Sequence, residues 1–207
     1  MTPTIASIAD ELLARSDGKD RFIVALAGPP GAGKSFRSAW LARQLNERLP
    51  GIAEVVPMDG YHYDNAVLEP MGLLALKGAP ETFDVEGLRH DLTRLKRADR
   101  PVAVPVFDRP LDLARAGARV ITPHHRLLIV EGNYLLLDHG PWQALQDFFD
   151  FSLFLEVDDS ELERRLIERW IGMGQDPSGA IAKARDKDML NARLIKTRSR
   201  RADLYWH

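Results

Sequence analysis

Short apolar runs alternate along the chain with segments in which apolar residues recur every three or four positions. An uninterrupted apolar run is typical of a strand buried on both faces, whereas the wider spacing is typical of an amphipathic helix. The runs predict strands over residues 21–27, 52–58, 126–131 and 151–157. The spaced segments predict helices over residues 5–13, 36–48, 85–97, 160–170 and 178–194. This alternation indicates an α/β fold with a doubly wound, mostly parallel sheet and helices on both faces.

Capping and breaking residues mark where these elements end. Thr2 or Thr4 is expected to cap the first helix, and Asp84 is expected to cap the helix at 85–97, because short polar side chains satisfy free backbone N–H groups there. Residues 64–83 contain two prolines and two glycines, so we expect this segment to be irregular.

One apolar run departs from the parallel pattern. Residues 102–107 read as a strand but contain Pro105, which cannot donate to a neighbouring strand and therefore favours an edge or a flap. Residues 118–122 are expected to pair with this run as a small β-hairpin, and residues 142–149 are expected to form a short helix.

The stretch Gly28–Ser35 fits the pattern G-x-x-x-x-G-K-[ST] at every fixed position, between a predicted strand and a predicted helix. This is the context of a P-loop, in which glycines and a helix N-terminus present backbone N–H groups to phosphate oxygens. Lys34 is expected to neutralise the terminal phosphates, and the Ser35 hydroxyl is expected to bind Mg²⁺. The expected nucleotide contacts here are Gly28, Pro29, Pro30, Gly31, Ala32, Gly33, Lys34, Ser35 and Phe36.

Two carboxylates follow predicted strands, at the edge where ligands gather in open α/β sheets. Asp59 follows the run 52–58; it could accept a proton from an attacking hydroxyl, hold Mg²⁺ through water, or cap the next loop. Glu131 ends the run 126–131, where many P-loop proteins carry an aspartate. We expect Glu131 to coordinate the metal or its water near Ser35.

The fourth predicted helix carries a group of arginines. Arg165 and Arg169 are four residues apart and share a face, so both can point at one phosphoryl group, whereas Arg164 cannot share that face with them. A solvated charged face is the alternative, because glutamates nearby can pair with these arginines. Two glycines just downstream favour a mobile lid over about residues 164–185, and we expect Arg165 and Arg169 to act in catalysis.

Aromatic and polar residues near Asp59 predict a pocket for a small molecule. Tyr61 and His62 lie two and three residues after Asp59, and Phe107 and Arg109 lie at and just after the end of the predicted flap strand. Rings and hydrogen-bonding groups of this kind line small-molecule sites. We assign His62 to this pocket rather than to catalysis.

Composition narrows the class of protein. The chain has 207 residues, with 28 Lys and Arg against 30 Asp and Glu, and this balance gives no support for a nucleic-acid partner. There is no cysteine, and the pair His124–His125 has no third ligand at a recognisable spacing, so we expect no zinc site there. No secretory leader pattern and no membrane-length apolar run is visible. We expect a single cytoplasmic domain over residues 1–207 without a membrane partner, and leave open a monomer or a homodimer.

Motifs elsewhere in the chain discriminate between classes of P-loop protein. The N-K-x-D motif of a GTPase is absent, and the run ending at Glu131 lacks the aspartate typical of motor ATPases. A small-molecule kinase needs a base for the acceptor hydroxyl, an acceptor pocket and a lid, and the sequence offers a candidate for each. A metabolite kinase is therefore the leading hypothesis, and an acceptor-free regulatory ATPase is the rival.

Five segments occur in a fixed order along the chain: Gly28–Ser35, Met58–Tyr63, Thr82–Asp84, Pro105–Arg109 and Val130–Tyr134. In this order they resemble the phosphoribulokinase/uridine kinase/bacterial pantothenate kinase family of P-loop kinases. The resemblance covers roughly residues 20–205, and within the family the chain looks most like bacterial proteins named fructose-transport kinase or fructokinase.

This resemblance implies ATP and Mg²⁺ as cofactors, Asp59 as the catalytic base and Glu131 near the metal. It also implies that the C-terminal region with Asn191 and Arg198 frames the adenine ring.

The family pattern places Asp84 and Tyr134 in the substrate pocket. The expected acceptor is a small metabolite, a sugar as in fructokinases, with a nucleoside or pantothenate as the alternatives. Uridine kinases carry an Asp-Ser-Phe-Tyr segment where this chain has Asp59–His62, which argues against uridine.

Overall fold

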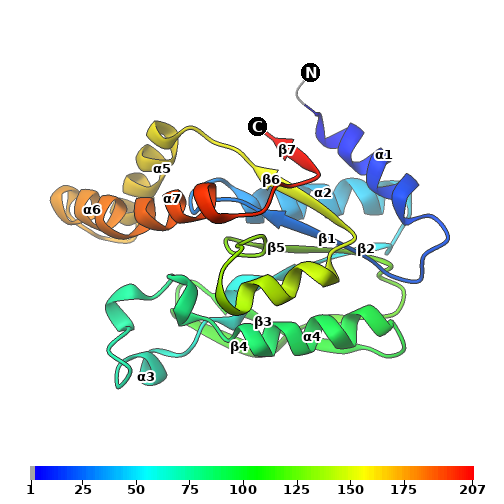
Figure 1. Cartoon of the computed structure of the whole chain (residues 1–207), viewed down its shortest axis with the longest axis horizontal. Coiled ribbons are helices and arrows are strands. Elements are labelled where there is room, and N and C mark those ends of the chain that lie inside the picture. Colours follow the sequence, from blue (N-terminus) through cyan, green and yellow to red (C-terminus); the bar gives the residue numbers. More distant parts are fainter. Residues whose placement is uncertain (1–2) are drawn as a thin grey trace.

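The computed structural model describes residues 3–207 and has a five-stranded parallel sheet at its centre (Figure 1). The strands of this sheet are β1 Phe22–Ala27, β2 Ala53–Pro57, β5 Leu127–Gly132, β6 Phe151–Leu155 and β7 Leu204–Trp206. Their order is β2-β5-β1-β6-β7, so the strand before the P-loop is central. The apolar pattern did not predict β7, because its three residues are too few to show a period.

Helices cover both faces of the sheet, which confirms the predicted α/β class (Figure 1). They are α1 Ile5–Ser16, α2 Lys34–Arg48, α3 Asn65–Leu68, α4 Val85–Arg97, α5 Asp159–Gly172, α6 Pro177–Lys183 and α7 Met189–Arg198. Alternate side chains of β1 enter different cores: Ile23 and Ala25 pack with α4, whereas Val24 and Leu26 pack with α1, α2 and α5. Two apolar cores therefore explain why every residue of β1 is buried.

Side-chain caps fix the start of two predicted helices. At α1, the Ser7 backbone N–H donates to Thr4 Oγ1 at 3.1 Å, and the Thr4 N–H donates to Ser7 Oγ at 3.0 Å. The alternative cap, Thr2, lies outside the described residues. At α4, Asp84 accepts a hydrogen bond from the Gly87 N–H at 2.9 Å.

The predicted flap is a separate two-stranded antiparallel sheet. It is formed by β3 Val102–Asp108 and β4 Leu113–Ile121, and it is longer than the sequence pattern predicted. The pairing shifts register around Pro105, as expected for a residue that lacks a backbone N–H. The hairpin packs closely on the turn after β2, because a Cβ on Gly60 would lie 2.4 Å from the Pro105 carbonyl oxygen.

Two regions differ in regular structure from the sequence prediction. The segment 64–83 holds α3 and two short 3₁₀ turns, Leu74–Leu76 and Pro80–Thr82. The predicted helix 178–194 is α6 and α7 joined by a π turn, Ala184–Asp188. Among residues 3–207, the structure contains no helix whose length and apolar character would suffice to span a bilayer.

Candidate active site

The P-loop connects the end of β1 to α2, which starts two residues before its predicted position. Gly33 is the N-cap of α2 with a φ of 87°, a conformation that favours glycine, and it makes no side-chain hydrogen bond to the helix. The backbone N–H groups of the first turn are therefore available to an anion. The geometry fits the predicted cradle for phosphate groups.

Lys34 is buried at the start of α2, where its Nζ donates to the Pro29 carbonyl at 2.9 Å. Burial lowers the pKa of Lys34 to about 8, while the negative charges of Glu131 and Asp59 act in the opposite direction. An ammonium group has three donors, so Lys34 can also bind a phosphate oxygen. Such a phosphate would favour the charged form of the lysine.

Ser35 and Glu131 are in direct contact. The Ser35 hydroxyl donates to Glu131 Oε1 at 3.0 Å. Glu131 is the second-last residue of β5 and is only 5% exposed. Burial raises the pKa of Glu131, and the nearby charge of Asp59 adds to this effect. A hydroxyl beside a desolvated carboxylate is a donor set that suits Mg²⁺, which prefers oxygen ligands.

Asp59 lies in the 3₁₀ turn Met58–Tyr61, directly after β2. Its Oδ2 atom accepts a hydrogen bond from Arg109, which reaches across from the hairpin with an NH2–Oδ2 distance of 2.6 Å. Asp59 also contributes to the raised pKa of Glu131, so the two carboxylates are electrostatically coupled. The structure thus brings together the predicted base, the predicted metal ligand and a residue of the predicted pocket.

A cavity of about 570 Å³ lies beside these groups, between α2, β2 and the hairpin. Its size is within the range of small-molecule sites. Five residues singled out from the sequence contribute to its wall: Ser35, Asp59, Phe107, Arg109 and Glu131.

Other residues of this wall were missed in the sequence. The wall also includes Ser38, Ala42, Asn46, Glu54 and Arg119. Ser38, Ala42 and Asn46 follow Ser35 at helical spacing, so the face of α2 that carries the P-loop serine could have indicated them. Arg119 had no such signal, because it is brought to β2 by the hairpin, where it donates to Glu54 Oε1 at 3.2 Å.

His62 packs at the edge of this region. Its ring lies between Phe83 and Phe107, with centroid distances of 4.0 and 4.8 Å, and its Nδ1 is 2.8 Å from the Asp59 carbonyl oxygen. Burial lowers the pKa of His62, which favours the neutral ring at pH 7. This environment supports a packing role, and a substrate contact by His62 stays a prediction.

Tyr61 and Tyr134 do not line the cavity as the sequence suggested. Tyr61 is buried and its hydroxyl donates to Asp91 Oδ2 at 2.9 Å, on α4. Tyr134 is fully buried and its hydroxyl donates to the Gly78 carbonyl at 2.6 Å. Both hydroxyls satisfy groups of the protein itself, because a buried phenol needs a partner. A substrate contact by Tyr61 or Tyr134 is thus less favoured by the structure and stays a prediction.

Four further residues were predicted to contact nucleotide or substrate, and the structure places them without testing those roles. Asp84 is engaged as the cap of α4, and Phe36, 72% exposed, lies near Trp40 with a centroid distance of 6.1 Å. Asn191 and Arg198 lie on α7, seven residues apart and so on similar faces of the helix.

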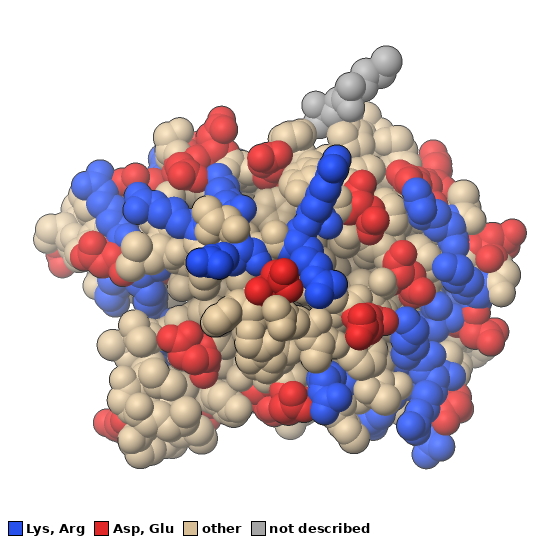
Figure 2. All heavy atoms as spheres, viewed as in Figure 1, with Lys and Arg blue, Asp and Glu red and all other residues tan. Residues whose placement is uncertain are grey.

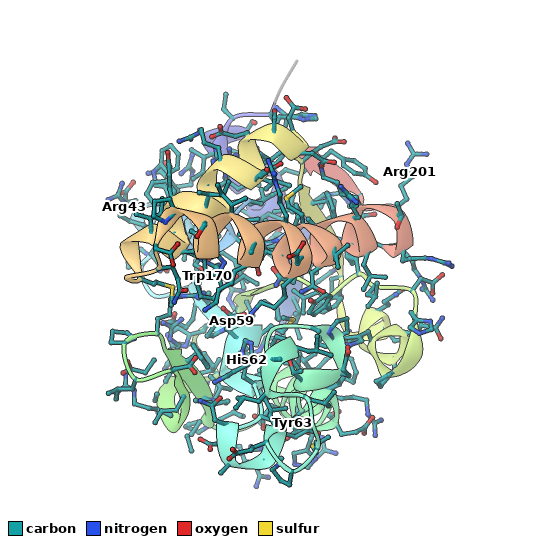
Figure 3. All side chains as sticks on the ribbon, turned by 90° about the vertical axis from the view of Figure 1, so that its left-hand side faces the viewer. Arg43, Asp59, His62, Tyr63, Trp170 and Arg201 are labelled. Atoms are coloured by element: carbon teal, nitrogen blue, oxygen red, sulfur yellow. The ribbon has the colours of Figure 1, made fainter. Side chains whose placement is uncertain are left out.

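The arginines of α5 have different partners, and the catalytic role of Arg165 and Arg169 stays a prediction. Arg165 NH1 donates to the Gly31 carbonyl of the P-loop at 3.3 Å, and Arg169 NH2 lies 3.6 Å from Asp188 Oδ2. The charge of Arg169 also helps to depress the pKa of Lys34. Arg164 pairs with Glu161 and Glu168, and Arg165 also pairs with Glu161 at 2.7 Å, as in the charged-face alternative. Figure 3 shows Asp59 and His62 below the helical layer that carries Trp170, the residue after Arg169.

Comparison with known proteins places this chain among kinases. No family model matches the chain. A candidate fructose transport system kinase from Silicibacter sp. TM1040 is 46% identical to the chain, and its crystal structure aligns with a TM-score of 0.93 over 99% of this chain and 100% of that chain.

Two curated relatives carry different names. A candidate uridine kinase of Schizosaccharomyces pombe is 35% identical over 94% of this chain and 87% of its own length. A pantothenate kinase of Parvibaculum lavamentivorans is 32% identical over 83% of this chain, which spans 55% of that protein's length. The named acceptors thus differ among relatives of similar identity.

Proposed function

The chain belongs to the phosphoribulokinase/uridine kinase/pantothenate kinase family of P-loop kinases, and we propose that it transfers the γ-phosphoryl group of ATP to a hydroxyl of a small sugar. One observation carries this proposal: Ser35, Asp59 and Glu131 converge in the wall of one cavity next to the P-loop. A P-loop alone supports nucleotide binding, whereas a cavity with the carboxylate of Asp59 in its wall offers a place for an acceptor.

Ser35 and Glu131 are the proposed ligands of Mg²⁺. Their 3.0 Å contact puts two oxygen donors together at the start of α2, close to where the P-loop would hold the terminal phosphates. When bound there, Mg²⁺ neutralises charge on the phosphate oxygens. The buried Glu131 would be held in its charged form by the metal, which offsets the cost of its burial.

Asp59 is the proposed base. It follows β2 and lies in the cavity wall, so an acceptor hydroxyl there could donate a hydrogen bond to its carboxylate. In the transfer, the acceptor oxygen forms a bond to the γ-phosphorus, and the bond from that phosphorus to the β–γ bridging oxygen breaks. The hydroxyl proton passes to Asp59, and ADP leaves with the electron pair of the broken bond.

Lys34, Arg165 and Arg169 are the proposed stabilisers of the transferred group. Lys34 lies in the P-loop, Arg165 contacts the loop carbonyl of Gly31, and Arg169 lies close enough to influence the pKa of Lys34. We propose that the surrounding segment, about residues 164–185, acts as a lid of the same domain and excludes water during transfer.

A sugar is the proposed acceptor because the relative with 46% identity is named for fructose transport. A nucleoside and pantothenate are the alternatives, since relatives at 35% and 32% identity are named uridine and pantothenate kinases. Hydrolysis of ATP without an acceptor is the remaining alternative.

Measuring ADP release separates these possibilities. Purified protein with ATP and Mg²⁺ would be tested alone and with fructose, uridine or pantothenate, with Lys34→Ala as the background control. We expect one acceptor class to raise the rate at least tenfold over ATP alone. A rate that is the same with and without every acceptor would favour the acceptor-free ATPase.

A further inference from the structure

Three cationic side chains converge on the ring of Trp170, at the end of α5. The Arg169 guanidinium carbon and the Nζ atoms of Lys183 and Lys187 lie 5.5, 4.6 and 5.1 Å from the ring centroid. Each cation is attracted by the electron-rich ring face, but like charges this close also repel one another. The three residues come from α5, α6 and the π turn, so the fold brings together cations from three consecutive helical segments.

One buried carboxylate organises this cluster. Asp188 accepts a hydrogen bond from Trp170 Nε1 at 2.7 Å and lies 3.6 Å from Arg169 NH2. Of the salt bridges formed within residues 3–207, this is the one that includes a member of the cluster. Asp188 faces three cations, and Asp112, which also acts on Lys187, is already paired with Lys77, so the cluster keeps an excess of positive charge that favours an anion.

Lys187 is half-buried, whereas the other two cations of the cluster are exposed. Its Nζ donates to the Lys77 carbonyl at 3.2 Å, on the segment that precedes α4. Burial lowers the pKa of Lys187, and the charges of Arg169 and Lys183 act in the same direction. An ammonium group with one carbonyl partner retains donors for further oxygen atoms.

The π turn places Lys187 and Asp188 in this position. A π turn adds a residue to the helix and rotates the side chains that follow, and such turns are frequent at functional sites. Figure 2 shows basic side chains over α5 to α7, with acidic side chains among them.

The cluster borders the candidate active site. Arg169 belongs to the cluster and also depresses the pKa of Lys34 in the P-loop. Arg165, one helical turn before Arg169 on α5, donates to the Gly31 carbonyl of the P-loop at 3.3 Å. In Figure 3, Trp170 extends from the helical layer toward Asp59. An anion held by the cluster would thus lie next to the phosphate cradle.

We propose that Lys187, together with Arg169, binds the terminal phosphoryl group of the nucleotide on the side opposite Lys34. Trp170 and Asp188 are positioning residues that hold these two cations in place. This inference rests on the proposed kinase function and names a further residue that contacts the transferred group.

Calorimetry with a non-hydrolysable ATP analogue and with ADP tests this role. Lys187→Gln keeps a donor for the Lys77 carbonyl but removes the charge. We expect its affinity for the analogue to fall about 10- to 100-fold, as for the loss of a charge-assisted hydrogen bond, while its affinity for ADP changes less than about twofold. Lys187→Arg should restore most of the loss. Arg185→Gln is the control, since Arg185 lies in the same turn but pairs with the exposed Glu163.

Each other outcome contradicts the proposal. Equal weakening of both nucleotides, with a lower melting temperature, would show that Lys187 only fastens the helices to the Lys77 carbonyl. Unchanged affinity for the analogue, with loss of inorganic phosphate binding to the ADP complex, would assign the cluster to the phosphorylated product instead. Binding needs no acceptor, so a protein that binds nucleotide as expected but phosphorylates nothing would refute the proposed function alone.

Discussion

The guanidinium of Arg109 lies 2.6 Å from the carboxylate of Asp59, so the hairpin is tied to the turn that follows β2. A second ion pair on the hairpin, Arg115–Asp108, has a length of 3.2 Å and nearly the same exposure. The arginines are 59% and 57% exposed, and the aspartates are 23% and 21% exposed. The pairs differ in location, because Arg109 and Asp59 line the cavity and Arg115 lies outside its wall.

This matched pair gives the first prediction. Arg109→Gln should raise the KM for the acceptor about three- to tenfold and leave the KM for ATP within about twofold, since the P-loop is untouched. Arg115→Gln removes an equally exposed ion pair and should change both constants less than about twofold. Equal effects of the two substitutions in steady-state assays would show that Arg109 only stabilises the hairpin.

The second prediction concerns Asp59 as the base. Asp59→Asn keeps the shape of the side chain but cannot accept the hydroxyl proton, so kcat should fall about 10²- to 10⁴-fold while ATP affinity changes little. Asp64→Asn is the control, because Asp64 caps α3 and asparagine serves nearly as well at that position. A raised KM for ATP with kcat intact would instead assign Asp59 to the positioning of Mg²⁺.

Much of the fold, the P-loop and the position of Glu131 could be predicted from local sequence. The P-loop glycines, Lys34 and Ser35 are adjacent in the chain, and their chemistry depends on a strand–loop–helix context that apolar spacing reveals. Glu131 could be placed near Ser35 because it ends a long apolar strand, and parallel strands bring their carboxyl ends to one edge. The 3.0 Å contact between the two residues agrees with that placement.

The remainder depends on tertiary packing. A tyrosine beside a candidate base looks the same in sequence whether its ring lines a cavity or enters the core. Tyr61 enters the core because Asp91 on α4 offers its hydroxyl a partner 30 positions away. The cluster around Trp170 is likewise invisible in sequence, since the π turn shifts Lys187 and Asp188 from their α-helical positions. Such contacts have no period or motif.

The third prediction follows from the lowered pKa of Lys34, about 8 in the free protein against 10.5 for an ordinary lysine. The lysine loses its proton as the pH rises through about 8, and ATP prefers the charged form. The affinity for ATP should therefore be constant at lower pH and fall above pH 8, by at most about tenfold per pH unit. Lys34→Arg keeps its charge throughout, so its affinity, measured by calorimetry from pH 7 to 9, should lack this decline.

The fourth prediction tests the close contact between the hairpin and the turn that carries Asp59. Gly60→Ala would place a Cβ 2.4 Å from the Pro105 carbonyl oxygen, so the backbone must move apart. Overpacking of this kind should destabilise the protein by about 1–3 kcal/mol in thermal unfolding, and should lower kcat because Asp59 moves with its neighbour. Gly172→Ala has no atom within 4 Å of the new Cβ and should leave the melting temperature unchanged or higher.

Phosphorus NMR of a reaction with ATP, Mg²⁺ and one acceptor tests most directly whether the γ-phosphoryl group is transferred to a hydroxyl. The account predicts that, with fructose, uridine or pantothenate, a phosphomonoester signal grows in step with ADP, and that Asp59→Asn suppresses both signals. Growth of inorganic phosphate alone, at the same rate with and without each acceptor, would contradict it.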